Sequence, residues 1–343
     1  MTRKRIVGLC SFVIGLGSLI LSFEIVGTGA PEDWSTQFYA AALNWRHPYE
    51  VPGFYNMPWL VWLLRPLAML GAHYSYTSWV IVTTLLLVWS MQRLGADLTS
   101  IILCIISPYY YYILINGNVD ALSVAGVALL EYSPGVGALF LLIKPQELAL
   151  VLLGAHYQRR DVAILTIALL VAFVLHGPWP IDFALAILNH GPQGQWWNCA
   201  IFPYGLPFAA GLVAIGLTWH DPALLAAACP FASPYVTGIM FFPVLCLLLP
   251  RLSGREQFAL IAVAWISTRI IFHNSLASWC VKFFCPVGTA CSAPTYVYVH
   301  IALGRILTWC GYGSTIYAIA VIVHRDYPSL TDSVGLRRRT GPT

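Results

Sequence analysis

Long apolar runs separated by short polar breaks follow one another along almost the whole 343-residue chain. Because about 20 apolar residues let an α-helix cross a bilayer, this pattern predicts an all-α polytopic membrane protein with about 10–12 transmembrane helices in one domain, 1–343. The predicted spans are 6–26, 57–72, 76–92, 98–114, 117–132, 135–154, 162–178, 203–218, 222–233, 236–250, 257–273 and 296–324. Breaks at Asn116–Asp120 and Pro230–Tyr235 leave open whether the segments beside them are separate spans or broken helices.

Three of the predicted connections are long, and all three fall on the same side of the membrane. They cover about 27–56, 179–202 and 274–295, and they carry aromatic and polar residues. Connections on the other side are mostly a few residues long. Long loops favour a working face on their side of the membrane. The alternative, that they are amphipathic lids over helix ends, stays open.

The first long connection contains a helical pattern of its own. Apolar residues recur at helical spacing and form one stripe, which consists of Trp34, Phe38, Ala41, Ala42 and Trp45. The pattern predicts a short amphipathic helix along the membrane surface. Pro31 suits its first position, and the adjacent acids Glu32 and Asp33 stand at its start. In a chain this apolar, the two carboxylates mark the first candidate for chemistry.

Composition and charge placement agree with a membrane protein. The chain is 59% hydrophobic and only 9% charged, against about 25% charged for an average soluble domain. Basic residues gather in cytoplasmic loops, which here places both termini in the cytoplasm and the first span as an uncleaved anchor in the plasma (cytoplasmic) membrane. The inner segments then hold Arg3, Lys4, Arg5, Arg159, Arg160, Arg251, Arg255, Arg325, Arg337, Arg338 and Arg339, and the outer segments only Arg46, Arg93 and Lys282. The basic tail 325–343 is an orientation signal, and no nucleic-acid partner is predicted.

Motifs for metals, nucleotides and cofactors do not occur in the sequence. There is no HExxH, no paired CxxC, no Asp-x-Asp and no glycine-rich phosphate loop. No cofactor is predicted, and a divalent metal is not indicated. Four cysteines in outer loops, where the compartment is oxidising, predict at least one disulfide. These are Cys199, Cys280, Cys285 and Cys291, and free thiols remain the alternative.

Basic residues within or beside the spans need a reason, since a charge inside a bilayer costs about 2.5–3.5 kcal/mol. Each has either a structural acid partner or an anionic ligand such as a lipid phosphate. Arg269 and His273 lie one helical turn apart at the outer end of a span and are the preferred phosphate contact. Arg305 lies in the last span, and Lys144 lies deeper in the sixth.

Several short motifs follow one another in an order that resembles a known family. They are Asp33, Phe38–Ala41, His47–Tyr49, Tyr55–Pro58, Arg65–Leu67, Ser107–Pro108, Gly117–Asp120, Lys144–Gln146, Arg159–Arg160 and Ser233–Tyr235. The run resembles the polyprenol-phosphate-mannose-dependent mannosyltransferases of the GT-C superfamily and extends to about residue 250. The chain departs from the family at Asn118, where relatives usually have Gln, at Asn44–Arg46, where they have a glycine-rich turn, and after Tyr235, where they often have His.

The resemblance implies a GT-C-like bundle and a membrane glycosyltransferase. Such an enzyme moves mannose or another hexose or pentose from a polyprenyl-monophosphate donor to a lipid or glycan acceptor at the outer face, with inversion. An acid in the first outer loop is the general base. Asp33 matches the family spacing to Phe38–Ala41, and Glu32 is the second candidate. The candidate donor-phosphate and substrate contacts are Arg46, His47, Tyr49, Arg269, His273, Lys282, Lys144 and Arg305.

Two other functions remain open at this point. A lipid or glycolipid transporter or flippase can use the same membrane charges as a headgroup path. Transporters more often show interrupted helices at matching positions in two halves, and the sequence contains no such repeat. An inactive relative can instead serve as a subunit of an envelope-assembly complex.

Overall fold

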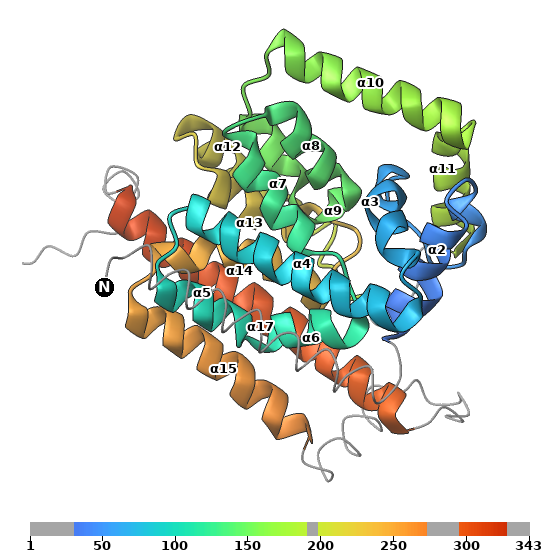
Figure 1. Cartoon of the computed structure of the whole chain (residues 1–343). Helices are drawn as coiled ribbons and strands as arrows, with labels where there is room; N and C mark the ends of the chain where they lie inside the picture. Colours follow the sequence, from blue (N-terminus) through green and yellow to red (C-terminus); the bar gives the residue numbers. More distant parts are fainter. Residues whose placement is uncertain (1–30, 191–197, 273–294, 328–343) are drawn as a thin grey trace, which may run out of the picture.

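The computed structural model describes residues 31–190, 198–272 and 295–327, and within them every regular element is a helix (Figure 1). The all-α prediction is therefore confirmed. The elements are η1 (Trp34–Phe38), α2 (Tyr39–Leu43), η2 (Pro48–Glu50), α3 (Trp59–Ala68), α4 (Ala72–Arg93), α5 (Leu98–Ile105), α6 (Pro108–Asn116), α7 (Ala121–Leu130), α8 (Pro134–Ile143), α9 (Pro145–Leu148), η3 (Ala149–Gly154), α10 (Arg159–His176), α11 (Trp179–His190), α12 (Leu206–Thr218), α13 (Pro222–Ala232), η5 (Gly238–Met240), α14 (Phe241–Leu248), η6 (Leu249–Arg251), α15 (Gly254–Phe272) and α17 (Thr295–Asp326).

Helices α13 and α14 form the centre of the molecule. Nearly every residue of both is buried, as expected for helices that are apolar on all sides. Helices α7 and α8 pack against each other as a pair, and α4 packs against α7. Helices α15 and α17 lie side by side at the lower edge of Figure 1. The short segments that contain the candidate site pack against this core.

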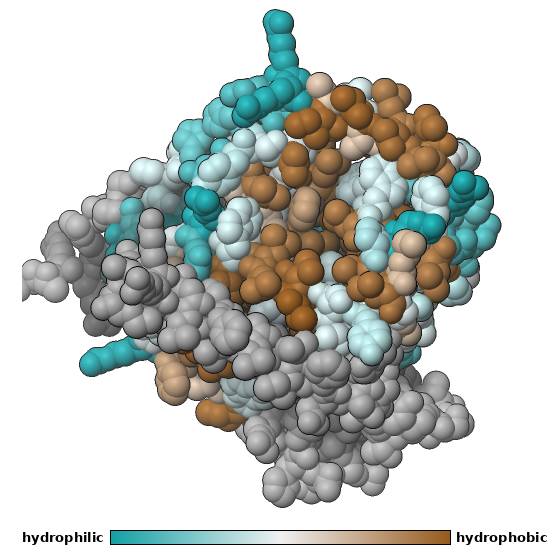
Figure 2. Space-filling model, viewed as in Figure 1, coloured by the Kyte–Doolittle hydropathy of each residue, from teal (hydrophilic) through white to brown (hydrophobic). Residues whose placement is uncertain are grey.

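Helices α10 and α11 stand away from the core and meet at an angle of 78° (Figure 1). Large apolar side chains of α10 are exposed, among them Ile167, Leu170 and Val174. Figure 2 shows hydrophobic side chains along α10, with hydrophilic ones at its start. An apolar surface of this kind needs a partner other than water.

In the described part of the chain, one segment is long and apolar enough by itself to cross a membrane, namely Leu307–Asp326 within α17. The count rises to four if each bent helix pair is one span. These pairs are α5 with α6, bent by 49°, α8 with the segment Pro145–Gly154, bent by 112°, and α10 with α11. The predicted number of crossings is therefore not confirmed. The first predicted span, 6–26, lies outside the described residues.

The predicted span 57–72 is a short helix that does not carry the chain away from the first long connection. Helix α3 has 10 residues, about 15 Å, which is half the thickness of a bilayer core. The next helix then begins beside Trp34, whose ring stacks on Trp79 at 5.6 Å and whose Nε1 donates to Ser75 Oγ at 3.4 Å. The structure thus brings the first long connection and the start of α4 together, whereas the predicted span 57–72 would separate them by one crossing.

Contacts at the opposite end of α4 also differ from the predicted arrangement. The charge pattern places Arg93 in an outer segment and Arg160 in an inner one, yet both contact Tyr132: Arg93 Nη1 donates to its hydroxyl at 2.9 Å and Arg160 Nη2 to its carbonyl at 3.4 Å. Gly135 N also donates to Asp161 Oδ1 at 3.0 Å. The segment between these two residues thus begins and ends at the same end of the molecule. The cause is the 112° bend after α8, which a hydropathy pattern does not reveal.

Candidate functional site

The helix that carries Asp33 is packed into the protein. Trp34, Phe38, Ala41 and Ala42 are buried, which confirms the predicted apolar stripe. The stripe packs against α4 through Trp34, so protein covers it there, and the predicted location along a membrane surface stays a prediction. Its first turn is a π-helix, in which the Tyr39 N–H donates to the Trp34 carbonyl. Turns of this type occur frequently at functional sites.

Two neutral amides hold the carboxylate of Asp33. Gln37, one turn further along the helix, donates from Nε2 to Oδ1 at 2.9 Å. Asn118, 85 residues away in sequence, donates from Nδ2 to Oδ2 at 3.1 Å. Asn118 comes this close because Gly117 precedes it with φ +73°, and a Cβ on Gly117 would stand 2.5 Å from the Cβ of Trp34. Only glycine fits this approach.

Lys144 continues the chain of contacts into the core. Its Nζ donates to Asn118 Oδ1 and forms ion pairs with Asp120 at 3.1 Å and Glu147 at 3.2 Å. Because Lys144 binds the amide oxygen of Asn118, the amide nitrogen has to face Asp33. We refer to Asp33, Asn118, Asp120, Lys144 and Glu147 as the acid–lysine network. Lys144 lies at the 112° bend, so the bend places its ammonium group beside the start of α7.

The acid–lysine network holds three carboxylates and one ammonium group. Burial of Asp33, only partly opposed by Lys144, raises its pKa from 3.8 to about 6, and the charges of Glu32 and Asp120 add to the rise. A carboxyl group with this pKa is mostly ionised at neutral pH and accepts a proton readily. Glu32 is exposed and lies outside the network. The structure therefore separates two neighbouring acids that the sequence could not distinguish by position alone.

Tyr112 lies between Asp33 and the Ser233–Tyr235 segment. Tyr112 is within electrostatic range of both Asp33 and Tyr235. The Ser233–Tyr235 segment is held by Asn198, whose Nδ2 donates to the Pro234 carbonyl at 2.9 Å. One more of the motifs with family resemblance, around Asn118, thus contacts the acid directly, and the motif around Tyr235 is connected to it through Tyr112.

Sequence reasoning missed Gln37, Tyr112, Ser123 and Glu147. Glu147 binds Lys144 and accepts from Ser123 Oγ at 2.6 Å. Gln37 stands four residues after Asp33 and Glu147 three after Lys144, spacings that place side chains on one helix face. That spacing was a usable signal. Nothing in the sequence pointed to Tyr112 or Ser123.

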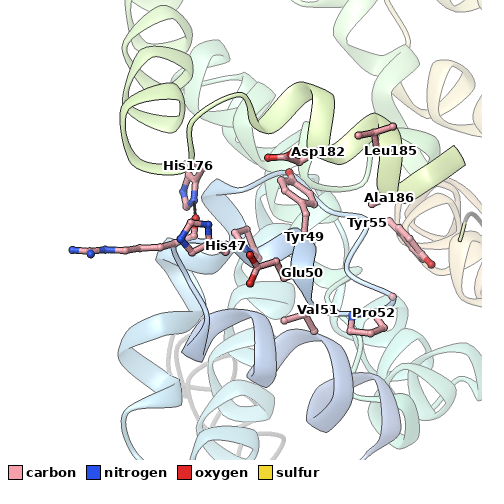
Figure 3. Close-up of a pocket in the computed structure, with 13 residues that line it drawn as sticks. His47, Tyr49, Glu50, Val51, Pro52, Tyr55, His176, Asp182, Leu185 and Ala186 are labelled. Carbon is pink, nitrogen blue, oxygen red and sulfur yellow. Dashed lines mark hydrogen bonds between the residues drawn. The ribbon is translucent and has the colours of Figure 1, made fainter. Parts of the chain in front are cut away.

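Arg46, His47 and Tyr49 lie together beside this site, in a pocket of about 330 Å³. Figure 3 shows the pocket between the loop that holds η2 and the helices α10 and α11. Arg46 also lies over the ring of Trp45 at 5.4 Å, and Arg65 lies over the same ring at 4.9 Å. The structure thus brings three of the predicted substrate contacts to one place.

The other predicted contacts are only partly described. Arg305 is half-buried on α17, within electrostatic range of Cys199. Arg269 belongs to α15, but its side chain lies outside the described residues. The same holds for His273, Lys282, Cys280, Cys285 and Cys291. The disulfide prediction therefore stays a prediction.

Among the described residues, no group of three His, Cys, Asp or Glu side chains is arranged to hold a metal ion. Comparisons of the chain with protein-family models, with curated proteins and with solved structures found no match.

Proposed function

We propose that the chain is an integral-membrane glycosyltransferase that moves a sugar from a polyprenyl-monophosphate donor to an acceptor at the outer membrane face. The observation that carries this proposal is the convergence of three distant segments on one carboxylate. Asp33, Asn118 and Lys144 are joined by hydrogen bonds. The same three segments carry the family resemblance, which rests on sequence order and contains no information about distance.

The proposed reaction needs one base and one leaving group. The acceptor hydroxyl attacks the anomeric carbon of the donor sugar, its proton passes to the Asp33 carboxylate, and the bond to the phosphate oxygen breaks with its electron pair. The pKa of Asp33 near 6 suits a base at neutral pH. A single displacement inverts the anomeric centre and needs no carboxylate nucleophile.

Within this proposal, Lys144 is a positioning residue. Its ammonium group is engaged by Asp120 and Glu147, so its charge is already matched. Its effect on Asp33 passes through Asn118, whose orientation it fixes. Contact with the donor phosphate is then left to other cations, such as Arg65, whose guanidinium group lies over the ring of Trp45 at 4.9 Å.

The contacts at the two ends of α4 support a revised membrane orientation. If 57–72 does not cross, the end with Arg93, Tyr132 and Arg160 is cytoplasmic, and the end with Asp33 and Asn118 is outer. Arg93 then belongs to a cytoplasmic segment, so the excess of Arg and Lys on the cytoplasmic side becomes larger. Helix α10 has 18 residues, a length of about 27 Å, and a bilayer would cover its exposed apolar side chains.

The test uses purified protein in nanodiscs with a panel of polyprenyl-phosphate sugars and a membrane extract as acceptor. Asp33→Asn should reduce transfer by about 10²–10⁴-fold while the protein remains folded by size-exclusion chromatography. The matched control, Glu32→Gln, should keep most of the activity. If both variants keep full transfer, neither acid is the base.

Loss of activity only in Glu32→Gln would move the base to that residue. If wild-type protein moves a labelled lipid across the bilayer but transfers no sugar, the chain is a transporter. Neither result is expected from the geometry.

A further inference from the structure

We propose that the pocket between η2, α10 and α11 binds uncharged sugar units of the acceptor. Its lining residues are Arg46, His47, Pro48, Tyr49, Glu50, Val51, Pro52, Gly53, Tyr55, His176, Asp182, Leu185 and Ala186. The volume of about 330 Å³ falls within the range of small-molecule sites, about 300–1,000 Å³. The role of the pocket as an acceptor site rests on the proposed function. The binding of sugar units to the pocket does not depend on that function.

The polar groups of the pocket suit hydroxyl groups. Within the described residues, the carboxylate of Asp182 has no hydrogen-bond or ion-pair partner, and Figure 3 shows it beside Tyr49 in the pocket. Glu50 lines the pocket as well, and from the described part of the chain it receives one long side-chain hydrogen bond, 3.3 Å, from Asn44. Carboxylates accept hydrogen bonds from sugar hydroxyls, and the rings of Tyr49 and Tyr55 provide flat apolar surface beside them.

The charge of the pocket disfavours a phosphate group. Its lining contains one arginine, Arg46, and two carboxylates, Glu50 and Asp182. His176 does not add a positive charge, because its Nε2 accepts a hydrogen bond from Trp62 Nε1 at 2.8 Å. An anionic ligand would meet a net negative lining, and like charges repel. The contacts predicted for a donor phosphate, Arg46, His47 and Tyr49, thus fit a neutral glycan better.

The pocket is also placed correctly for an acceptor. Gly53, in its lining, lies against Gln37, and a Cβ built on Gly53 would stand 3.0 Å from Gln37 Cδ. Gln37 in turn donates to Asp33. A single side chain therefore separates the pocket from the proposed base. A glycan bound in the pocket can extend one hydroxyl toward Asp33 past Gln37.

Direct binding tests the inference without catalysis. The protein in nanodiscs is titrated with a panel of methyl glycosides of common hexoses and pentoses, observed by saturation-transfer NMR, with sodium phosphate as the competing probe. We expect at least one glycoside to bind, and phosphate not to displace it. Asp182→Asn and Glu50→Gln should each weaken binding by about tenfold, the usual effect of losing a hydrogen bond to a charged group.

Two further variants make the result specific. Glu131→Gln, a matched change at an exposed acid far from the pocket, should leave binding unchanged. Leu185→Trp adds bulk at a lining position that is 49% exposed, so it should block the pocket without affecting folding. The inference is overturned if no glycoside binds, if phosphate competes, or if binding survives Asp182→Asn and Leu185→Trp.

The same titration on Asp33→Asn separates this inference from the proposed function. Glycoside binding should persist there although transfer is lost. If glycosides bind but wild-type protein transfers no sugar, the pocket stands and the enzyme assignment fails. Transfer without glycoside binding would support the enzyme assignment and overturn the role of the pocket.

Discussion

The acid–lysine network and a second ionic cluster near the other end of the chain use the same residue types in opposite ways. The second cluster, here the Asp221 clamp, consists of Asp221, Arg251, Arg325, Asp326 and Tyr327. Asp221 caps α13 by accepting from Ala223 N at 2.9 Å, and it also binds Arg251 and the hydroxyl of Tyr327. Arg251 Nη2 and Arg325 Nε each reach Asp326 at 2.8 Å. The charges of two arginines balance those of two aspartates, so the clamp carries no net charge.

The charges of the acid–lysine network are not balanced in this way. Lys144 balances Asp120 and Glu147 only in part, and the side chains that donate to Asp33 within the described ranges are the neutral amides of Gln37 and Asn118. The consequence is seen at Asp33, where burial without a directly bound cation raises the pKa to about 6. Asp326, in contrast, is held by two guanidinium groups that favour its ionised form. Charge balance therefore distinguishes a carboxylate that holds helices together from one that is available for proton transfer.

The largest expected effect comes from removing the cation of the network. Lys144→Met leaves Asp120 and Glu147 buried without a positive partner, which should destabilise the fold by about 3–5 kcal/mol. Thermal unfolding in nanodiscs measures the loss. The triple variant Lys144→Met, Asp120→Asn, Glu147→Gln removes the charges together and should recover most of the stability. An unchanged melting temperature in the single variant would show that Lys144 is not the balancing charge.

The next effect follows from the raised pKa of Asp33. A carboxyl that binds its proton more tightly in the folded chain contributes stability below its unfolded pKa of 3.8, and this contribution is lost as pH rises through about 6. The stability of wild type relative to Asp33→Asn should therefore fall by about 2 kcal/mol between pH 4 and pH 7.5. Parallel unfolding curves of the two proteins across this range would contradict the shift. The rate of transfer should fall below about pH 6, where the base becomes protonated.

The smallest effects are expected in the Asp221 clamp. Arg251→Met removes hydrogen bonds to Asp221 and Asp326 and should cost about 2 kcal/mol. Arg325→Met should cost less than about 1 kcal/mol, because its side chain is half exposed to solvent. Neither change should alter transfer per folded molecule. A loss of transfer without a loss of stability would place the clamp in the mechanism and remove the contrast between the two clusters.

Asp33 shows how far the sequence leads toward the site. Its position at the start of a helix marks it only together with Glu32, and its spacing to Phe38–Ala41, which matches the resembling family, makes it the preferred candidate of the two. The buried stripe beside it was also correctly predicted, because helical periodicity marks the face that leaves solvent. Periodicity does not say what covers that face. Trp34 packs on Trp79 of α4, whereas the pattern predicted a membrane surface there.

The predicted membrane spans show where the sequence was misleading. Hydropathy located most of the apolar helices, but it treated 57–72 and 135–154 as full crossings. The first contains a helix of only 10 residues, and the second bends by 112°. Hydropathy counts apolar residues along the chain and contains no information about direction, so a helix that turns back looks the same as one that continues.

The sequence by itself determined the helical class, the apolar stripe and the candidate acid, since these depend on composition and on spacings within a few residues. The tertiary structure alone decided that Asp33 meets Asn118 and Lys144, because that contact depends on the sharp bend after α8 and on the close approach at Gly117. It also decided which Lys and Arg side chains are already paired with carboxylates. The pKa of a carboxylate is set by the groups within a few ångströms of it, and those groups come from segments that only folding brings together.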